Sequence, residues 1–363
     1  MKIAVLSMQR IINYGSFLQA YALKTILESF GNEVGFIDIR DGEYHETPTS
    51  LPSGLIYKLK LHGRHLLKWV RFRKINKEVN QIIRDAQAGY LGLTPARMEH
   101  APETDAVLIG SDEVFNCAPK SSWGVSTQLF GDIDVPAVLS YAASCGYTVL
   151  SDIPKEYVGK IGRCLKRMKV VSVRDENTHA FVQEASGIDA LSHADPVILY
   201  DFKEEVLQAE RRIAADEPYM IIYAYSNRIN KKSEIEAIKR YAKEHHLKTY
   251  CVGGMLSWCD RFPRWDPFEV LAGFKHADCI VTDTFHGTIM AAKYNKPFAV
   301  LIRESNKNKL NDLLQRFELI SHRVDNVSVL ASVLSQPLTY DAFNRRVTEE
   351  RTRGLDYLKR YFS

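Results

Sequence analysis

The stretch CIVTDTFHGTIMAAKYNKPFAVLI (Cys279–Ile302) contains the order of elements that decides the fold. Its first residues, Cys279–Thr282, are apolar or β-branched and predict a buried strand, and Pro297–Ile302 predicts a second one. Between them, Thr288–Tyr294 has the composition of a helix. A strand, a helix and a strand in close succession are typical of a βαβ unit, whose two strands lie parallel in one sheet.

The same succession recurs along the chain. Near the N-terminus, strands at 2–7 and 34–39 flank a helix at 17–27. Further strands are expected at residues 106–109, 137–141, 170–173, 219–224 and 247–252. The two series are separated by a polar stretch at 201–217. They predict an α/β protein with two Rossmann-like domains that face each other across a cleft.

The polar stretch also predicts where the domains begin and end. We place the N-terminal domain at 1–205, on the acceptor side of the cleft, and the C-terminal domain at 215–335, on the donor side. A last helix at 340–363 is expected to pack back on the N-terminal domain.

The composition is that of an ordinary globular protein, with 45% hydrophobic and 25% charged residues in a chain of 363. The net charge of +4 is too small to indicate a nucleic-acid partner, and we expect none. The six cysteines are scattered, which is typical of reduced thiols in a cytosolic protein. No segment approaches the ~18 uninterrupted apolar residues of a membrane span, so we expect a cytoplasmic location. No residues have metal-ligand spacing, and neither a metal nor a cofactor is expected.

One basic segment stands apart from this balance. Residues 47–77 contain no Asp or Glu but many Lys and Arg, and we predict a helical insert at about 54–85. Leu59, Leu66 and Val70 can share one helical face. The segment is either a surface helix whose apolar stripe packs on the domain, or a basic amphipathic contact. In the second case residues 55–77 would bind an anionic membrane surface or a lipid-linked substrate.

The ends of the predicted strands are where a ligand is expected, because open parallel sheets bind ligands beyond their carboxyl ends. In the DTFHG motif a helix follows the strand, so backbone N–H groups and the positive end of the helix dipole favour an anion there. Gly287 would let the backbone approach a ligand. His286 could donate a hydrogen bond or a proton. The alternative is that His286 caps a carbonyl inside the fold.

Two other strand ends carry polar residues. Arg174 offers a planar fork that matches carboxylate or phosphate, unless it forms a salt bridge with Asp175 or Glu176. The NYGS loop at residues 13–16 lacks the glycines of a dinucleotide-binding turn, and its simpler role is a turn with Ser16 as the helix N-cap.

Taken in order, several motifs resemble the polysaccharide pyruvyl transferase family from about residue 3 to residue 323. These motifs are NYGSFLQAYAL (13–23), GSDEVFN (110–116), SYAASCG (140–146), SVRDE (172–176), ADP (194–196), the segment 268–298 and LNDLLQRFEL (310–319). The chain departs from the family pattern at Glu113, where an amide is usual, at Phe115, where an indole is usual, and at Thr284, where serine is usual. If Glu113 faced the site it would repel an anionic donor, so either it points away or acceptor recognition differs.

The resemblance implies a fold similar to GT-B glycosyltransferases, with phosphoenolpyruvate as donor and co-substrate. The product would be a cyclic pyruvate ketal on two hydroxyls of a sugar in a capsule, an exopolysaccharide or its precursor, and the acceptor could be carried on a lipid diphosphate. The family's histidine and arginine correspond to His286 and Arg174.

We therefore expect the site to be divided between the two domains. The candidate catalytic residues are His286, Arg174 and Asp112. The candidate donor-binding residues are Arg174, Thr284, Phe285, His286, Gly287, the helix that starts at Thr288, Arg303 and Lys307, the last two being equally compatible with solvated surface. The candidate acceptor-binding residues are Asn13, Tyr14, Gly15, Ser16, Asp112 and Glu113.

Two other functions are compatible with the same fold. The chain could be a GT-B-type glycosyltransferase that uses a nucleotide sugar, or a non-catalytic relative that binds a glycan or an anion.

Overall fold

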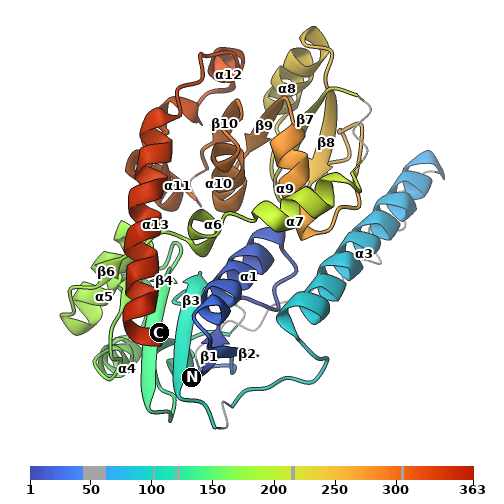
Figure 1. Ribbon diagram of the computed structural model, residues 1–363. Helices are drawn as coiled ribbons and strands as arrows, with labels where there is room; N and C mark the ends of the chain where they lie inside the picture. The colour runs from blue at the N-terminus through green and yellow to red at the C-terminus, as the bar shows by residue number, and fades with distance from the viewer. Residues whose placement is uncertain (44–62, 101–102, 119–120, 122, 214–216, 304–305) are drawn as a thin grey trace.

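The computed structural model describes residues 1–43, 63–100, 103–118, 121, 123–213, 217–303 and 306–363, with the backbone alone for 63–69. Two parallel sheets form two domains, as predicted from the repeated strand–helix order. Figure 1 shows the N-terminal domain below and the C-terminal domain above, with α1 and α9 near the junction.

The N-terminal sheet has the strand order β2-β1-β3-β4-β5-β6, and its paired strands are all parallel. The strands are β1 (Lys2–Leu6), β2 (Glu33–Ile37), β3 (Ala106–Asp112), β4 (Ala137–Ala143), β5 (Ser172–Val173) and β6 (Leu191–Ser192). The helices of this part are α1 (Tyr14–Ser29), α3 (Gly63–Leu91), α4 (Lys155–Leu165) and α5 (Glu176–Ser186), with short 3-10 turns η1 (Thr127–Phe130) and η2 (Leu150–Asp152). The strand order reverses between β1 and β3, which is where such sheets bind ligands.

The C-terminal sheet has the order β11-β10-β9-β7-β8 and is also parallel throughout. Its strands are β7 (Tyr219–Tyr223), β8 (Lys248–Val252), β9 (Cys279–Thr282), β10 (Phe298–Leu301) and β11 (Arg323–Val324). Its helices are α8 (Lys232–Glu244), α9 (Pro267–His276), α10 (Phe285–Lys293), α11 (Lys307–Arg316) and α12 (Leu330–Leu334), with turns η3 (Ile320–His322) and η4 (Val327–Val329). Every residue of β7, β9 and β10 is buried, because helices cover both faces of the sheet.

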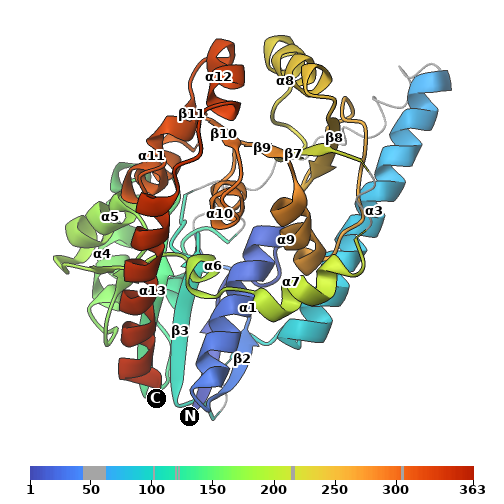
Figure 2. The same ribbon diagram turned by 45° about the horizontal axis from the view of Figure 1, so that its top comes forward.

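The two domains are joined by α6 (Pro196–Leu199) and α7 (Lys203–Glu210) and by the last helix, α13 (Asp341–Phe362). In both views α13 runs down the N-terminal domain (Figures 1 and 2). The Tyr357 hydroxyl donates to the carbonyl of Ser140 in β4 at 2.7 Å, and the Asn32 side chain donates to the carbonyl of Phe362 at 2.6 Å. The C-terminal helix therefore packs on the N-terminal sheet.

Two predicted helix starts are wrong, for the same reason. Helix α1 begins at Tyr14 because the Asn13 side chain accepts from the amides of Gly15 and Ser16, so Asn13 is the N-cap in place of Ser16. Helix α10 begins at Phe285 instead of Thr288, because the Thr284 hydroxyl accepts from the Gly287 amide. Both caps lie in loops that the sequence assigned to ligand binding.

The basic segment is described only in part. Residues 44–62, which include 55–62 of the predicted contact, lie outside the described residues. The described part of α3 reaches the C-terminal domain: the Phe72 ring lies 5.0 Å from the Phe262 ring, and Glu78 pairs with Arg264 at 2.7 Å. Val70 is exposed, whereas Ile75 is buried. No described helix has both the length and the apolar character that a membrane crossing requires.

Candidate active site

A small cavity of about 50 Å³ lies between the two domains, at the carboxyl ends of strands from both sheets. The N-terminal domain contributes polar residues from the ends of β1, β3 and β5, and the C-terminal domain contributes the last residue of β7 and residues that follow β7, β9 and β10. The residues that line it are Asn13, Ser16, Asp112, Glu113, Arg174, Tyr223, Tyr225, Arg228, Asp283, Thr284, Phe285, His286, Asn306 and Lys309. The predicted histidine, arginine and Asp112 are thus brought together.

His286 lies in the first turn of α10 and is 9% exposed. Its Nε2 lies 3.5 Å from Asp195 Oδ2 and has no hydrogen-bond partner among the described residues. The ring is pressed against Gly15 of α1, where an added Cβ would lie 2.2 Å from Nδ1. The imidazole is therefore held between the domains, with Nε2 facing a carboxylate and not the carbonyl that we considered.

Arg174 follows β5 and is buried in the site. Its Nη1 donates to Asp195 Oδ2 at 2.8 Å, and its Nη2 lies 3.8 Å from Asp112 Oδ1. Its guanidinium stacks 4.1 Å from the centre of the Phe285 ring, across the domain boundary. The expected alternative, a salt bridge to Asp175 or Glu176, is wrong for Asp175, which caps α5 instead by accepting from the Thr178 amide at 2.9 Å.

Asp195 is one of the residues that sequence reasoning missed. Its side chain is fully buried and connects Arg174 to His286. Burial alone would raise the pKa of the Asp195 carboxyl, but the nearby His286 and Arg174 outweigh it and lower that pKa to about 2. The available signal was its position before Pro196, because Asp195 also caps α6 by accepting from the Val197 amide.

Asp112 ends β3 in the left-handed backbone region, with φ of 71°. Its Oδ2 accepts from the Ser16 hydroxyl at 2.8 Å. Asn13 lies beside Ser16, and its side chain donates to the Tyr225 hydroxyl of the C-terminal domain at 3.4 Å. The predicted acceptor-side residues Asn13, Ser16 and Asp112 therefore form one connected wall of the cavity.

Tyr14 and Gly15 belong to the domain contact and not to the cavity lining. The Tyr14 hydroxyl donates to the carbonyl of Trp265 at 2.9 Å, and Gly15 makes room for His286.

Glu113 faces the cavity, and its charge has a partner. Its Oε1 accepts from Lys309 Nζ at 2.7 Å, across the two domains, and its Oε2 accepts from the Asn116 side chain at 3.1 Å. Burial raises the pKa of the Glu113 carboxyl, but Lys309, Arg174 and Asn116 together outweigh it and lower that pKa to about 2. The carboxylate that departs from the family pattern at Glu113 is therefore neutralised by Lys309.

Arg303 and Lys307, the two cations that follow β10, do not lie where the donor-binding prediction placed them. Arg303 pairs with Glu234 and lies 3.3 Å from Asp283, so it supports the floor of the site. Neither Arg303 nor Lys307 is among the described residues that line the cavity. Arg228 and Lys309 line the cavity instead. Arg228 lies in the segment that follows β7, and Lys309 lies in α11, the helix that begins at the predicted Lys307.

The fixed charges of the cavity lining nearly cancel. Three cations (Arg174, Arg228 and Lys309) meet three carboxyls (Asp112, Glu113 and Asp283). Burial raises the pKa of Asp283 against the effect of Arg228, which favours its neutral form.

The start of α10 places its backbone at the cavity. The Gly287 amide is already bound by Thr284, and the Thr288 amide by the Thr284 carbonyl, which leaves the amides of Phe285 and His286 at the open end. Gly287 itself packs under the turn, where a Cβ would lie 2.2 Å from Thr282 Oγ1. Its glycine character serves this packing and not the approach of a ligand.

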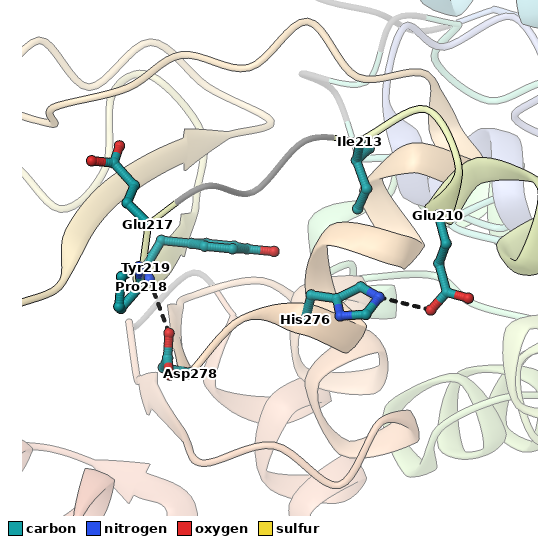
Figure 3. Close-up of a pocket in the computed structure, with 7 residues that line it drawn as sticks. All are labelled: Glu210, Ile213, Glu217, Pro218, Tyr219, His276 and Asp278. Atoms are coloured by element: carbon teal, nitrogen blue, oxygen red, sulfur yellow. Dashed lines mark hydrogen bonds and ion pairs between the residues drawn. The ribbon is translucent and has the colours of Figure 1, made fainter.

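A larger cavity of about 470 Å³ lies elsewhere and does not fit a catalytic site. Figure 3 shows that Tyr219 and Asp278 line it, at the amino ends of β7 and β9. The Tyr219 amide donates to Asp278 at 2.9 Å, and His276 pairs with Glu210 at 2.8 Å. Parallel sheets bind ligands at the opposite edge.

The comparisons with known proteins agree with this architecture. A family model described as polysaccharide pyruvyl transferase matches residues 13–305. Comparison with curated proteins finds no match. Among solved structures, the chain is similar to the UDP-GlcNAc 2-epimerase of Methanocaldococcus jannaschii in complex with UDP-GlcNAc and UDP, at 11% identity over 98% of this chain and 100% of that chain, with a TM-score of 0.51.

It is also similar to Arabidopsis thaliana UGT89C1 complexed with UDP-L-rhamnose, at 10% identity over 99% of this chain and 98% of that chain, with a TM-score of 0.49. The likeness to the epimerase shows the fold, which confirms the expected GT-B-like pair of Rossmann-like domains.

Proposed function

The chain belongs to the polysaccharide pyruvyl transferase family, which makes it a transferase that acts on polysaccharide, and from this premise we propose its reaction. It moves pyruvate from phosphoenolpyruvate onto two hydroxyls of one sugar and forms a cyclic ketal. The sugar belongs to a surface polysaccharide or its precursor.

The proposed chemistry begins with a proton. His286 donates it to the methylene carbon of phosphoenolpyruvate, which leaves a cationic C2 that a sugar hydroxyl attacks. The C2–O bond to phosphate then breaks, and the second hydroxyl closes the ring. Of the two hydroxyl protons, one replaces the proton that His286 gave and the other leaves with phosphate. Because Nε2 of His286 faces Asp195, Nδ1 is the nitrogen that we assign to the donor.

The donor carries about three negative charges at neutral pH, so it needs cations that can be released to it. Arg174 Nε has no hydrogen-bond partner among the described residues. Lys309 is held by Glu113, and Arg228 lies 3.8 Å from Asp283. In the proposed complex the donor's oxygens replace these carboxylates, and the amides of Phe285 and His286 add two more hydrogen bonds.

The observation that carries the proposal is the contact of His286 from one domain with Asp195 and Gly15 from the other. A proton donor assembled by closure of two domains suits a reaction whose cationic intermediate water would destroy. The wall formed by Asn13, Ser16 and Asp112 faces it and supplies acceptors for the sugar hydroxyl.

The test is product analysis with purified protein. Phosphoenolpyruvate is incubated with a panel of β-galactosides and N-acetylhexosamines, free and nucleotide-linked. Mass spectrometry should find the mass gain of one pyruvate less one water, with release of phosphate. Thermal stabilisation by UDP-, GDP- or CMP-sugars but not by phosphoenolpyruvate would instead favour a nucleotide-sugar glycosyltransferase. Binding of a glycan without turnover of any donor would favour a non-catalytic relative.

A lipid-linked acceptor, a cytoplasmic location and a membrane contact through residues 55–77 stay predictions. The exposed Arg71, Arg73, Lys74 and Lys77 of α3 are compatible with such a contact. Co-sedimentation with anionic and neutral vesicles at low and high salt tests it, and binding that ignores lipid charge would contradict it.

A further inference from the structure

A second cavity, of about 310 Å³, opens at the carboxyl ends of β1 and β2, and no predicted site residue lines it. Its residues come from the loops that follow β1, β2 and β3 and from the segment between α3 and β3. We call it the β1–β2 cavity and define it by Met8, Arg10, Ile39, Asp41, Arg97 and Trp123.

Its position is next to the catalytic site. The strand order reverses between β1 and β3, and the two cavities lie on either side of that point. The loop after β1 supplies Met8 and Arg10 to one cavity and Asn13 to the other. The segment after β3 supplies Glu113 to the catalytic cavity and Trp123 to the β1–β2 cavity.

Hydrogen bonds connect these walls. The Trp123 indole N–H donates to the carbonyl of Asn116 at 3.0 Å, and the Asn116 side chain donates to Glu113 at 3.1 Å. The Ser7 hydroxyl donates to the carbonyl of Ser111 at 3.1 Å, which joins the two loops from the other side. The two cavities therefore share one hydrogen-bonded partition.

Size separates their roles. The catalytic cavity of about 50 Å³ has no room for a glycan beyond the reacting groups, so the rest of an acceptor must lie outside it. The β1–β2 cavity has a volume in the range of small-ligand sites.

The chemistry of its lining indicates an uncharged ligand with one apolar face. Met8, Ile39 and Trp123 provide apolar surface, and the exposed Asp41 provides hydrogen-bond acceptors at the rim. The cations are engaged: Arg10 Nη2 pairs with Asp38 at 2.8 Å, and Arg97 donates to the carbonyl of Ile39 and lies 3.4 Å from Glu99. A phosphate would find no released cation there, whereas a sugar can stack its C–H face on an indole and donate its hydroxyls to a carboxylate.

We propose that the β1–β2 cavity binds the uncharged sugar unit next to the one that is pyruvylated, with Trp123 as the stacking surface and Asp41 as the hydroxyl acceptor. This rests on the proposed function for the identity of the reaction. It makes the enzyme specific for an oligosaccharide over a monosaccharide, and it assigns this specificity to residues outside the catalytic cavity.

The experiment compares lactose with galactose and diacetylchitobiose with N-acetylglucosamine, in wild-type protein and in Trp123→Ala, Trp123→Phe and Asp41→Ala variants. For the disaccharide that is turned over, kcat/KM should exceed that of its monosaccharide at least tenfold in the wild type. Trp123→Ala and Asp41→Ala should each reduce that ratio, while Trp123→Phe retains most of it. The KM of phosphoenolpyruvate should stay unchanged in all three.

A direct binding measurement keeps this test separate from the proposed reaction. Saturation-transfer NMR should show contact of the disaccharide with the wild type and loss of it in Trp123→Ala, whether or not a ketal forms. Equal binding of mono- and disaccharides, no binding of either disaccharide to the wild type, or an unchanged ratio in the exposed-site variant Asp41→Ala would each overturn the proposal.

Discussion

Asp195 of the N-terminal domain and His286 of the C-terminal domain meet in the site, with Oδ2 of the carboxylate 3.5 Å from Nε2 of the imidazole. The same carboxylate oxygen accepts a 2.8 Å hydrogen bond from Arg174. One buried anion thus orients both of the residues to which the proposed mechanism assigns charge. It can do so only while the two domains are in contact.

The first prediction concerns Asp195→Asn. The amide keeps the size of the side chain but removes the negative charge that stabilises an imidazolium, so kcat/KM should fall about 10²-fold or more. Steady-state kinetics with the donor and the acceptor measures this loss. Asp175→Asn is the matched control, because Asp175 is a buried carboxylate that caps α5, and this variant should keep most of the wild-type kcat/KM.

The second prediction concerns His286→Gln. Glutamine can keep a contact with Asp195 but cannot donate a proton near neutral pH, so turnover should fall by about 10²–10⁴-fold. Thermal stabilisation by phosphoenolpyruvate should persist, because Arg174 and the start of α10 remain. Measurement of kcat together with the melting temperature decides the matter. A variant that turns over normally would remove His286 from the chemistry, and one that unfolds would assign it a structural role.

The third prediction uses the contact of Gly15 with the His286 ring. In Gly15→Ala the new Cβ would lie 2.2 Å from His286 Nδ1, so the imidazole or the whole domain must move. Activity should fall at least as far as in His286→Gln, although residue 15 has no side chain that could take part. Gly35→Ala is the control, because a Cβ there meets nothing within 4 Å. Equal activity of the two alanine variants would contradict the observed domain contact.

These contacts also show which parts of the site could be predicted from the sequence. The pattern of strands and helices places Asn13, Asp112, Arg174 and His286 at strand ends, and parallel sheets bring such ends to one edge. Within each domain, local sequence patterns are therefore enough to place these residues at the ligand-binding edge of the sheet.

Contacts between distant segments cannot be predicted from such local patterns. Glu113 and Lys309 are 196 residues apart, and nothing in either motif indicates that they pair. Asp195 was visible as part of a motif, but its role depends on how the domains close. The starts of α1 and α10 were misplaced because Asn13 and Thr284 were interpreted only as ligand-binding residues. In the structure each side chain caps its helix by accepting from backbone amides, and each also lines the cavity.

The fourth prediction concerns the stability of the N-terminal domain at low pH. Burial, with help from Arg353 and Arg316, lowers the pKa of His193 to about 4 from an unfolded value near 6.5. The unfolded chain therefore binds a proton at His193 more readily than the folded domain does. As a result, the free energy of unfolding falls by about 3 kcal/mol as pH falls from about 6.5 to 4. Melting temperatures across this range should fall less steeply in His193→Gln. The exposed His245→Gln variant should behave like the wild type, and a slope that His193→Gln leaves unchanged would assign the loss to other groups.

The last prediction concerns the ion pair across the cleft. Glu113→Gln removes the carboxylate that holds Lys309 at 2.7 Å and so leaves this lysine for the donor. A hydrogen bond to a charged group is worth about 1.5 kcal/mol or more, so the KM of phosphoenolpyruvate should fall about tenfold. Lys309→Gln should act in the opposite direction and raise that KM, and added salt should narrow the difference between the two variants.

The pair of variants also separates two roles for Glu113. If this carboxylate binds the acceptor, Glu113→Gln will raise the KM of the sugar and leave the KM of phosphoenolpyruvate in place. Steady-state kinetics with each substrate varied in turn distinguishes the outcomes. The KM of phosphoenolpyruvate is expected to fall in Glu113→Gln and to rise in Lys309→Gln only if Glu113 and the donor compete for Lys309. A purely structural salt bridge would instead change this KM in the same direction in both variants.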